Sequence, residues 1–246
     1  MSLRFHEIAE SRQRILNPFT EEQLDLLGRI LGLRAGMRQL DLACGKGEML
    51  CRWARDHGTS GVGVDISAVF LAAARERVAE LGVADRVTLV QGDAAKYEAT
   101  PGGYDVVSCI GATWIGSGLV GTLALMRRAL KPGGLLLVGE PYWTEPPPTE
   151  AYAALGVGTG DFVSLEGTLD RIESASFELV EMVLASHEGW DRYEAPHWWA
   201  IHDYLRAHPD DPEAAALRDW ARSDRRGYFR YGRRYLGWGV FVLREA

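Results

Sequence analysis

The sequence predicts an α/β protein with a largely parallel, Rossmann-like sheet and helices on both of its faces. Short apolar runs typical of buried strands alternate with segments of helical periodicity along most of the chain. Glycines suited to ending helices follow these segments, as at Gly32, Gly58 and Gly82. A glycine-rich turn also joins the first apolar run to the helical segment behind it. We interpret residues 1–246 as one domain.

Residues 1–35 are expected to form an N-terminal helical arm. Asn17-Pro18-Phe19 interrupts the arm, and Thr20 begins its second helix. Thr20 and Gln23 have the spacing of a capping box, in which the threonine hydroxyl accepts from a free backbone N–H and the glutamine side chain reaches back. The tail of this arm, from Arg12 to Phe19, is expected to close over a crevice in the sheet.

Residues 36–140 carry the clearest alternation of strands and helices. The predicted strands are 39–43, 61–65, 86–91, 104–109 and 135–139, and the predicted helices are 47–57, 67–81 and one that ends near 130. Lys131-Pro132-Gly133-Gly134 predicts the turn into the fifth strand.

Residues 141–246 are expected to add loops, a helical insertion and the last strands. Four prolines between Pro141 and Pro148 predict a stiff, extended loop. A helix is predicted at 164–174, strands at 177–185 and 238–243, and a helix start at Asp211-Pro212-Glu213.

Composition limits the possible partners. The net charge of −7 argues against nucleic acid, which needs a concentrated basic face. The one arginine-rich stretch, from 222 to 234, is interpreted either as a solvated surface or as a docking surface for an anion. We expect no metal site, because Cys and His do not occur at ligand spacing, and no membrane segment. Three scattered cysteines and the lack of a signal-peptide core predict a cytoplasmic protein. The sequence carries no signal for an oligomeric state.

The segment from Leu40 to Glu48 is the most informative part of the chain. An apolar strand runs into Gly45 and Gly47, and a helix starts behind them. Glycines let the backbone turn sharply and approach a ligand, and the helix start offers free N–H groups. The dinucleotide fingerprint needs a third glycine where this chain has Leu50, which disfavours a pyrophosphate loop.

Two aspartates follow the second and third strands. Asp65 is placed to accept both hydroxyls of an adenosine ribose, although it could instead cap the next helix, as Ser67 also could. Asp93 could accept from an adenine amino group, or it could be a turn residue. Because carboxyl ends of parallel strands meet at one edge of a sheet, these aspartates and the glycine loop should border a single crevice.

At this point the chain resembles the class I S-adenosylmethionine-dependent methyltransferases. The matching segments are Asp41–Gly47, Gly63–Asp65, Gln91–Ala94, Tyr104–Val107 and Leu130–Gly134. A narrower resemblance, to a largely uncharacterised bacterial subgroup, rests on Asn17–Glu22, Gly47–Cys51, Gly139–Trp143 and Glu188–Glu194. It implies a seven-stranded mixed sheet whose last strand is antiparallel.

The resemblance implies S-adenosylmethionine as cofactor and a set of residues that contact it. Gly45 would approach the methionine part, Asp65 the ribose, Asp93 and Ala94 the adenine, and the backbone near Cys109 the amine. The full set of expected cofactor residues is Asp41, Ala43, Gly45, Gly47, Asp65, Ile66, Asp93, Ala94 and Cys109.

A small-molecule acceptor is predicted. Methyltransferases that act on nucleic-acid amino groups place an Asn-Pro-Pro-Tyr-like motif where this chain has Cys109 to Trp114. Glu140, Tyr142 and His187 are candidate catalytic residues, with Glu140 as a base, as an orienting group for Tyr142, or as a structural acceptor. His187 is the histidine base candidate because it lies nearest a strand end. Substrate contacts are expected from Trp114, Trp143, Trp190, Tyr193 and His197, each of which could instead be packing.

Two alternatives remain at this level. The chain could bind the cofactor without turnover, as a sensor. It could also be a nicotinamide-dependent oxidoreductase, the reading that Leu50 disfavours.

Overall fold

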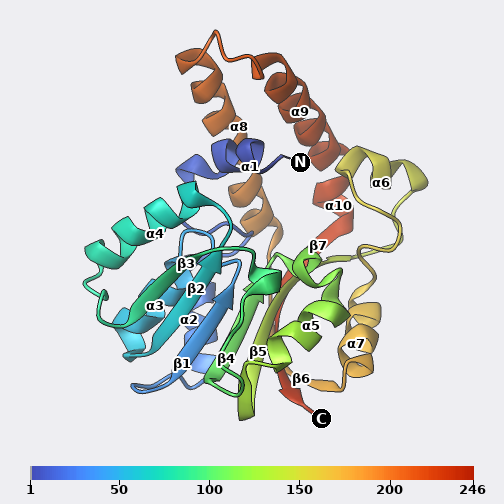
Figure 1. The fold of residues 1–246 in the computed structure, drawn as a ribbon. Helices are drawn as coiled ribbons and strands as arrows, with labels where there is room; N and C mark the ends of the chain where they lie inside the picture. Colours follow the sequence, from blue (N-terminus) through green and yellow to red (C-terminus); the bar gives the residue numbers. More distant parts are fainter. Residues whose placement is uncertain (1) are drawn as a thin grey trace.

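The structure, a computed structural model, describes residues 2–246 and contains one mixed seven-stranded sheet (Figure 1). The strands are β1 Arg38–Leu42, β2 Ser60–Asp65, β3 Val87–Gln91, β4 Tyr104–Ile110, β5 Leu130–Trp143, β6 Phe177–Leu184 and β7 Leu236–Glu245. Their order is β3-β2-β1-β4-β5-β7-β6, and β7 runs antiparallel to both of its neighbours. The α/β class and the antiparallel last strand are therefore confirmed.

Helices cover both faces of the sheet and one of its ends. The α-helices are α1 Leu3–Ala9, α2 Glu21–Ile30, α3 Glu48–His57, α4 Ala68–Glu80, α5 Leu119–Arg127, α6 Thr149–Leu155, α7 Leu165–Ser174, α8 His187–Ala207, α9 Ala214–Gly227 and α10 Arg233–Tyr235. Short 3-10 turns are η1 Glu10–Arg12, η2 Ala94–Lys96 and η3 Thr113–Gly116, and a π-helical turn, η4, spans Tyr228–Gly232. α2, α3 and α4 lie on one face, and α5 and α7 on the other.

The core follows the two-residue period of the strands. Along β7, Val240 and Val242 pack with the side chains of α2 and α3, whereas Phe241 and Leu243 pack with those of α5 and α7. Successive side chains of a strand point to opposite faces, so a continuous apolar run such as this one is what a sheet covered on both sides requires.

The predicted capping box is confirmed. Thr20 Oγ1 accepts from the Gln23 backbone N–H at 3.2 Å, and Gln23 Oε1 accepts from the Thr20 N–H at 3.1 Å. The amide of the same Gln23 donates to the carbonyl of Leu184 at 2.9 Å. The cap, which contributes about 1 kcal/mol in typical helices, thus also ties α2 to the end of β6.

Three local predictions are corrected. The predicted turn at 131–134 lies within β5, where the register with β4 shifts. The predicted loop from Pro141 begins later, because β5 pairs with β7 as far as Trp143 opposite Leu236. The prolines that follow lead directly into α6, a helix that is not among the predicted elements.

The remaining helices form a lid over the carboxyl ends of the central strands. α1, α8 and α9 stand above the sheet in Figure 1. The turn between α8 and α9 is fastened to α1, since the Arg4 guanidinium pairs with Asp211 and, at 2.5 Å, with Glu213. α9 begins at Ala214, three residues after the predicted start at Asp211, whose carboxylate accepts from the Glu213 N–H. Within residues 2–246, no helix combines the length and apolarity needed to cross a bilayer.

Candidate functional site

A cavity of about 770 Å³ lies between the carboxyl ends of the central strands and the helical lid. Its floor comes from the ends of β1, β2 and β4, and its roof from the N-terminal arm, α8 and α9. The site therefore lies where the strand order reverses, between β1 and β4, which is where α/β sheets bind ligands. Its volume suits a nucleoside together with a second small molecule.

The glycine loop forms one wall of this cavity. β1 ends at Leu42, and the backbone then adopts left-handed conformations at Ala43 (φ 60°), Gly45 (φ 55°) and Gly47 (φ 66°). Ala43 and Gly45 line the cavity, whereas Gly47 is buried behind them as the N-cap of α3. A Cβ on Gly45 would come within 2.8 Å of Leu16 Cδ1, so the arm lies directly over this loop.

Asp65 joins the end of β2 to the glycine loop. Its Oδ2 accepts from the Gly45 N–H and its Oδ1 accepts from the Ser67 N–H, each at 2.8 Å. Each carboxylate oxygen keeps a further lone pair, and the residue lines the cavity beside the exposed Ile66. Burial raises the pKa of Asp65, although the two backbone hydrogen bonds oppose the shift.

Asp41 supports the loop from below. It is buried at the end of β1, lines the cavity, and accepts from Ser108 Oγ on β4 at 2.6 Å. Burial raises the pKa of Asp41 to about 7, although the Ser108 hydrogen bond lowers it. This hydrogen bond links the two strands at which the crevice opens.

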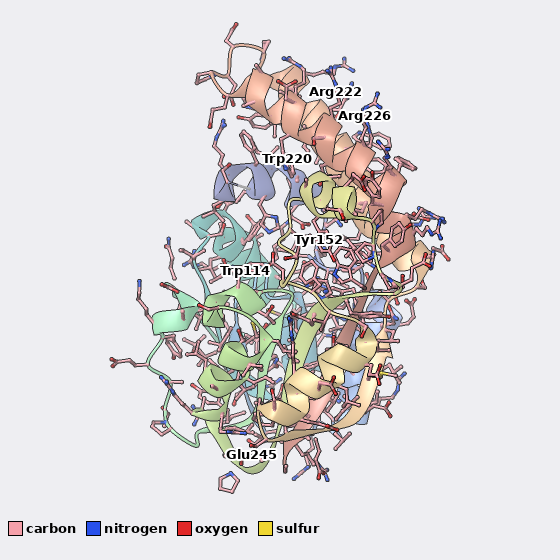
Figure 2. All side chains as sticks on the ribbon, turned by 90° about the vertical axis from the view of Figure 1, so that its right-hand side faces the viewer. Trp114, Tyr152, Trp220, Arg222, Arg226 and Glu245 are labelled. Carbon is pink, nitrogen blue, oxygen red and sulfur yellow. The ribbon has the colours of Figure 1, made fainter. Side chains whose placement is uncertain are left out.

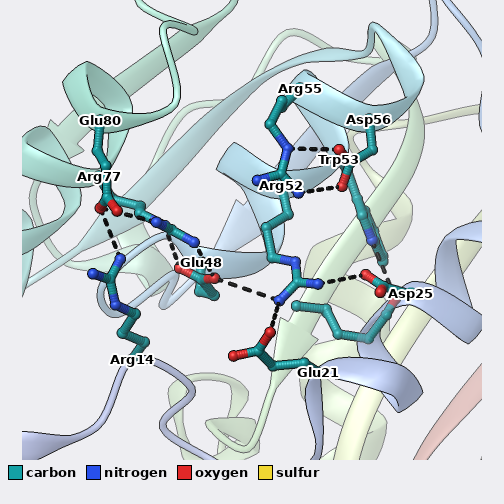
Figure 3. Close-up of polar contacts among 11 residues, drawn as sticks. Arg14, Glu21, Asp25, Glu48, Arg52, Trp53, Arg55, Asp56, Arg77 and Glu80 are labelled. Atoms are coloured by element: carbon teal, nitrogen blue, oxygen red, sulfur yellow. Dashed lines mark hydrogen bonds and ion pairs between the residues drawn. The ribbon is translucent and has the colours of Figure 1, made fainter.

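An arginine clamp fixes the start of α3, the first helix after the loop (Figure 3). The buried Glu48 carboxylate accepts two hydrogen bonds of 2.7 Å from Arg77, and Arg52 lies 3.8 Å away. A carboxylate in the first turn of a helix also interacts favourably with its dipole. Removing one member of a buried pair typically costs about 3–5 kcal/mol, so this clamp stabilises the start of α3 behind the loop.

The other predicted cofactor residues lie at the ends of β3 and β4. Asp93 and Ala94 line the cavity, with Asp93 Oδ1 accepting from the Ala95 N–H at 3.0 Å and Lys96 Nζ 3.0 Å from its carboxylate. Cys109 is fully buried and does not line the cavity, but the next residues, Ile110 and Gly111, do.

A threonine and a glutamate connect the cavity to the sheet. Thr113 lines the cavity, and its Oγ1 donates to Glu140 Oε2 at 2.6 Å. Glu140 itself lies behind Thr113, only 2% exposed. Burial raises the pKa of Glu140 to about 7, against the lowering effect of the Thr113 hydrogen bond. Beside this pair, Trp114 lines the cavity and is 72% exposed.

Three other candidates do not line the cavity. Tyr142 is buried in the core on the α5 and α7 face of the sheet, and its ring packs over Gly237. Trp143 is buried against Tyr152 and Phe162. His187 is exposed at the start of α8. The β5–β7 pairing holds the first two in the sheet, and β6 leads to His187 at the sheet's far edge.

The lid contributes the remaining predicted substrate residues. Trp190, Tyr193 and His197 all lie on α8 and line the cavity. The Tyr193 hydroxyl donates to Glu10 Oε1 at 2.8 Å, and His197 Nε2 lies 3.2 Å from Glu10 Oε2. Burial lowers the pKa of His197, but Glu10 outweighs that effect and the net shift is upward.

Several further residues line the cavity that are not among those predicted from the sequence. On the lid these are Glu194, Trp220 and Asp224, and on the arm His6 and Asn17. The spacing of Trp190, Tyr193, Glu194 and His197 on one helix face was a signal that could have identified Glu194. Asp224 was hidden within the arginine-rich stretch, whose Arg222 and Arg226 lie on the outside of α9 (Figure 2).

Lys46 ties the arm to the glycine loop. Its ammonium donates to the carbonyls of Glu10 at 2.7 Å, Gln13 at 2.5 Å and Ser11 at 3.4 Å. These carbonyls end α1 and η1, where a cation is favourable. Burial lowers the pKa of Lys46. Among residues 2–246, no three His, Cys, Asp or Glu side chains are grouped so that they could hold a metal.

Comparisons with known proteins agree with this geometry. Residues 40–134 match the family model described as a methyltransferase domain. The chain is 49% identical over 242 residues to the uncharacterised protein YjhP of Escherichia coli, covering 98% of this chain and 97% of that one. It also superposes on a SAM-dependent methyltransferase from Geobacter sulfurreducens, crystallised with S-adenosyl-L-homocysteine, with a TM-score of 0.95, 47% identity, and coverage of 100% of this chain and 99% of that one.

A more distant relative has a named reaction. The ubiquinone/menaquinone biosynthesis C-methyltransferase UbiE of Pseudomonas putida is 30% identical over 166 residues, which cover 67% of this chain and 64% of that protein.

Proposed function

The chain belongs to the S-adenosylmethionine-dependent methyltransferases, and on that premise we propose that it methylates a small-molecule acceptor inside the cavity beneath its lid. The observation that carries this proposal is that Asp65 and the glycine loop line the same cavity as aromatic side chains of the lid, Trp190, Tyr193 and Trp220. The wall with Asp65 suits a nucleoside, and the aromatic side chains suit an organic acceptor.

The residues of the first wall fit S-adenosylmethionine. The free lone pairs of the Asp65 carboxylate can accept from two ribose hydroxyls. Gly45 brings its backbone to the surface of the cavity, and Asp93 with Ala94 borders the space next to β3. We therefore place the ribose at Asp65, the methionine part over Gly45 and the adenine at Asp93 and Ala94.

The acceptor is expected between Thr113, Trp114 and the lid. When bound, S-adenosylmethionine supplies an electrophilic methyl group, and its sulfur keeps the bonding electron pair as the acceptor's lone pair forms the new bond to carbon. The main task of the chain is to align the acceptor and to exclude water, and orientation of this kind contributes up to about 7–11 kcal/mol. The arm, α8 and α9 roof the cavity and so perform the second task.

An acceptor that loses a proton can pass it through Thr113. The acceptor's proton moves to Thr113 Oγ as the threonine's own proton moves to the Glu140 carboxylate, 2.6 Å away. With a pKa raised to about 7 by burial, Glu140 is suited to taking up a proton near neutral pH. Glu140 thus acts through Thr113 as a positioning residue, and His187, exposed outside the cavity, has no part in this relay.

Enclosure supports a small acceptor. The lid reaches over the strand ends, and the cavity beneath it has room for a nucleoside and one further small molecule. The C-methyltransferase relative acts, by its name, in quinone biosynthesis, which is small-molecule chemistry. A protein that binds the cofactor without turnover is the competing function.

Turnover decides between the two. Purified protein is incubated with S-adenosylmethionine and a panel of phenols, amines, thiols and keto acids, and S-adenosylhomocysteine is quantified by mass spectrometry. We expect product with at least one acceptor class and none from Asp65→Ala. Tight S-adenosylhomocysteine binding without turnover on a broad panel would favour the silent binding protein, and binding of NAD alone would contradict both.

A further inference from the structure

One side of the cavity is continuous with the apolar core between the sheet and α2. Six side chains line the cavity and also pack into that core, and we call them the apolar recess. They are Ile15 and Phe19 of the arm, Met49 of α3, Ile110 of β4, and Trp238 and Val240 of β7. Segments that are far apart in the sequence therefore enclose a single apolar part of the cavity.

The apolar recess includes strands that lie beyond those proposed for the adenosine. Asp65 and Asp93, the residues proposed for ribose and adenine, follow β2 and β3. Ile110 ends β4 and Trp238 lies near the start of β7, both on the other side of β1. Ile110 also precedes Thr113 by three residues, so the recess begins beside the place where the acceptor is expected to react. A group bound in the recess would thus belong to the acceptor.

A glycine in β5 shapes the floor of the recess. A Cβ on Gly139 would come within 2.7 Å of Trp238 Cζ2 and 2.9 Å of Ile110 Cγ2, so the missing side chain lets both residues lie over the strand. From the arm, the Phe19 ring packs edge-on against Trp238, with the ring centroids 5.4 Å apart. The recess therefore lies between the sheet and the arm.

Apolar surface remains uncovered in the recess. Four of its side chains pack against the core and yet are only half-buried, namely Ile15, Phe19, Met49 and Ile110. Protein interiors leave few voids larger than a water molecule, and apolar voids destabilise the fold but can bind apolar molecules. A polar group placed here would exchange hydrogen bonds to water for contacts with hydrocarbon. An apolar group is therefore the occupant that this surface favours.

We propose, as an extension of the function above, that the acceptor is amphiphilic and places an apolar hydrocarbon group in the apolar recess. The nucleophile of the same molecule then lies beside Thr113, where it faces the methyl group of the cofactor. Binding of the apolar group fixes the position of the acceptor in the cavity and so aligns the nucleophile.

Calorimetry on protein saturated with S-adenosylhomocysteine tests this assignment, since no methyl transfer takes place there. The probes are phenol, 4-propylphenol and 4-(2-hydroxyethyl)phenol, of which the last two are equal in size and differ in the polarity of the chain end. Each buried CH₂ group improves affinity by about fourfold. We expect 4-propylphenol to bind at least about tenfold more tightly than either of the other probes.

Substitutions in the recess show whether it is the place where the chain binds. Met49→Gln and Ile15→Gln each introduce an amide at a similar side-chain size. In both variants the preference for 4-propylphenol over 4-(2-hydroxyethyl)phenol should fall at least about fivefold, because the propyl chain would cover the amide without bonding to it. Met182→Gln makes the same replacement at an exposed methionine of β6 outside the cavity, and there the preference should persist.

Each other outcome overturns the assignment. Equal binding of the three probes, or no binding of 4-propylphenol, would show that the recess does not take an apolar group. A preference retained in both Met49→Gln and Ile15→Gln would place the apolar group elsewhere in the cavity. Loss of S-adenosylhomocysteine affinity in both variants would assign the recess to the cofactor instead.

Folding and the proposed function are controlled separately. The comparison of the three probes on the wild type requires no variant to fold, and thermal unfolding shows whether each glutamine variant does. The proposed function is tested by turnover, and it can hold while this assignment fails.

Discussion

The Asp65 carboxylate accepts a 2.8 Å hydrogen bond from the backbone N–H of Gly45, 20 residues earlier in the chain. This contact couples the end of β2 to the turn after β1. The acid proposed to bind the ribose therefore also fixes the loop proposed to approach the methionine part. A displacement of either group would break this hydrogen bond.

Asp65→Ala should accordingly weaken S-adenosylhomocysteine binding strongly. Two charge-assisted hydrogen bonds to the ribose are lost, and the loop loses its acceptor, so we expect about tenfold to thousandfold weaker binding by calorimetry. Asp85→Asn, at an exposed aspartate outside the cavity, is the matched control and should bind as the wild type does. Unchanged S-adenosylhomocysteine affinity in Asp65→Ala would show that Asp65 does not bind the ribose.

Lys46→Met should free the N-terminal arm. The ammonium is the donor that joins the loop to three carbonyls of the arm. We expect faster tryptic cleavage at Arg12 and Arg14, together with weaker S-adenosylhomocysteine binding, because the arm covers Gly45 through Leu16. In the wild type, S-adenosylhomocysteine should slow this cleavage.

Lys131→Met is the control for that experiment, since Lys131 pairs with Asp105 away from the cavity. If the arm of Lys46→Met were as resistant to trypsin as the arm of Lys131→Met, the lysine would not hold it.

Glu140→Gln should change how stability depends on pH. Burial raises the pKa of Glu140 from 4.5 to about 7, so the folded state binds its proton more tightly than the unfolded state does. The stabilisation is fully present below pH 4.5 and is lost as the pH rises to about 7. Glu140→Gln has no carboxyl to titrate at this position, so its stability does not fall in this way. Relative to the wild type, the free energy of unfolding of Glu140→Gln, measured with urea, should therefore rise by about 1–3 kcal/mol between pH 5 and pH 8.

The exposed Glu178 provides the comparison for this measurement, because Glu178→Gln should follow the wild type at both pH values. A stability difference between Glu140→Gln and the wild type that stays constant with pH would show that Glu140 is not titrating in this range.

Thr113→Val should separate the relay from simple packing. The valine removes the hydroxyl between the cavity and Glu140 while keeping a similar shape. For an acceptor that loses a proton, we expect a lower kcat, roughly unchanged KM, and loss of the pH dependence near pH 7, with recovery in Thr113→Ser. A general acid–base step contributes about 100-fold to 10,000-fold, which bounds the decrease. An identical pH profile in Thr113→Val would exclude the relay, whatever the change in rate.

The sheet and the cofactor wall could be predicted because their signals are local. Asp65 and Asp93 each follow a strand, and the parallel strands bring those ends together whatever the rest of the chain does. The helical insertion and the covering arm were also expected, but the contacts that join them could not be predicted in this way. Glu10 meets His197 only because α1 packs on α8, a contact between segments 187 residues apart that no periodicity encodes.

The positions of the predicted catalytic residues also depend on pairing between distant segments, which local sequence signals do not reveal. Proximity to a strand end favours His187 in the sequence, but β6 lies at the edge of the sheet, two strands beyond β5. The prolines predict a loop for Tyr142 and Trp143, but Pro141 is compatible with the β5–β7 pairing and the strand continues through it. Thr113 could have been noticed, since it occupies the loop after β4 next to Trp114, an expected substrate contact.

A crystal structure of the protein with S-adenosylhomocysteine tests the central claim most directly. We expect both ribose hydroxyls within hydrogen-bond distance of the Asp65 carboxylate, the adenine beside Asp93 and Ala94, and the sulfur facing Thr113 and Trp114 across the cavity. A ligand bound elsewhere, or one whose ribose does not contact Asp65, would contradict the account.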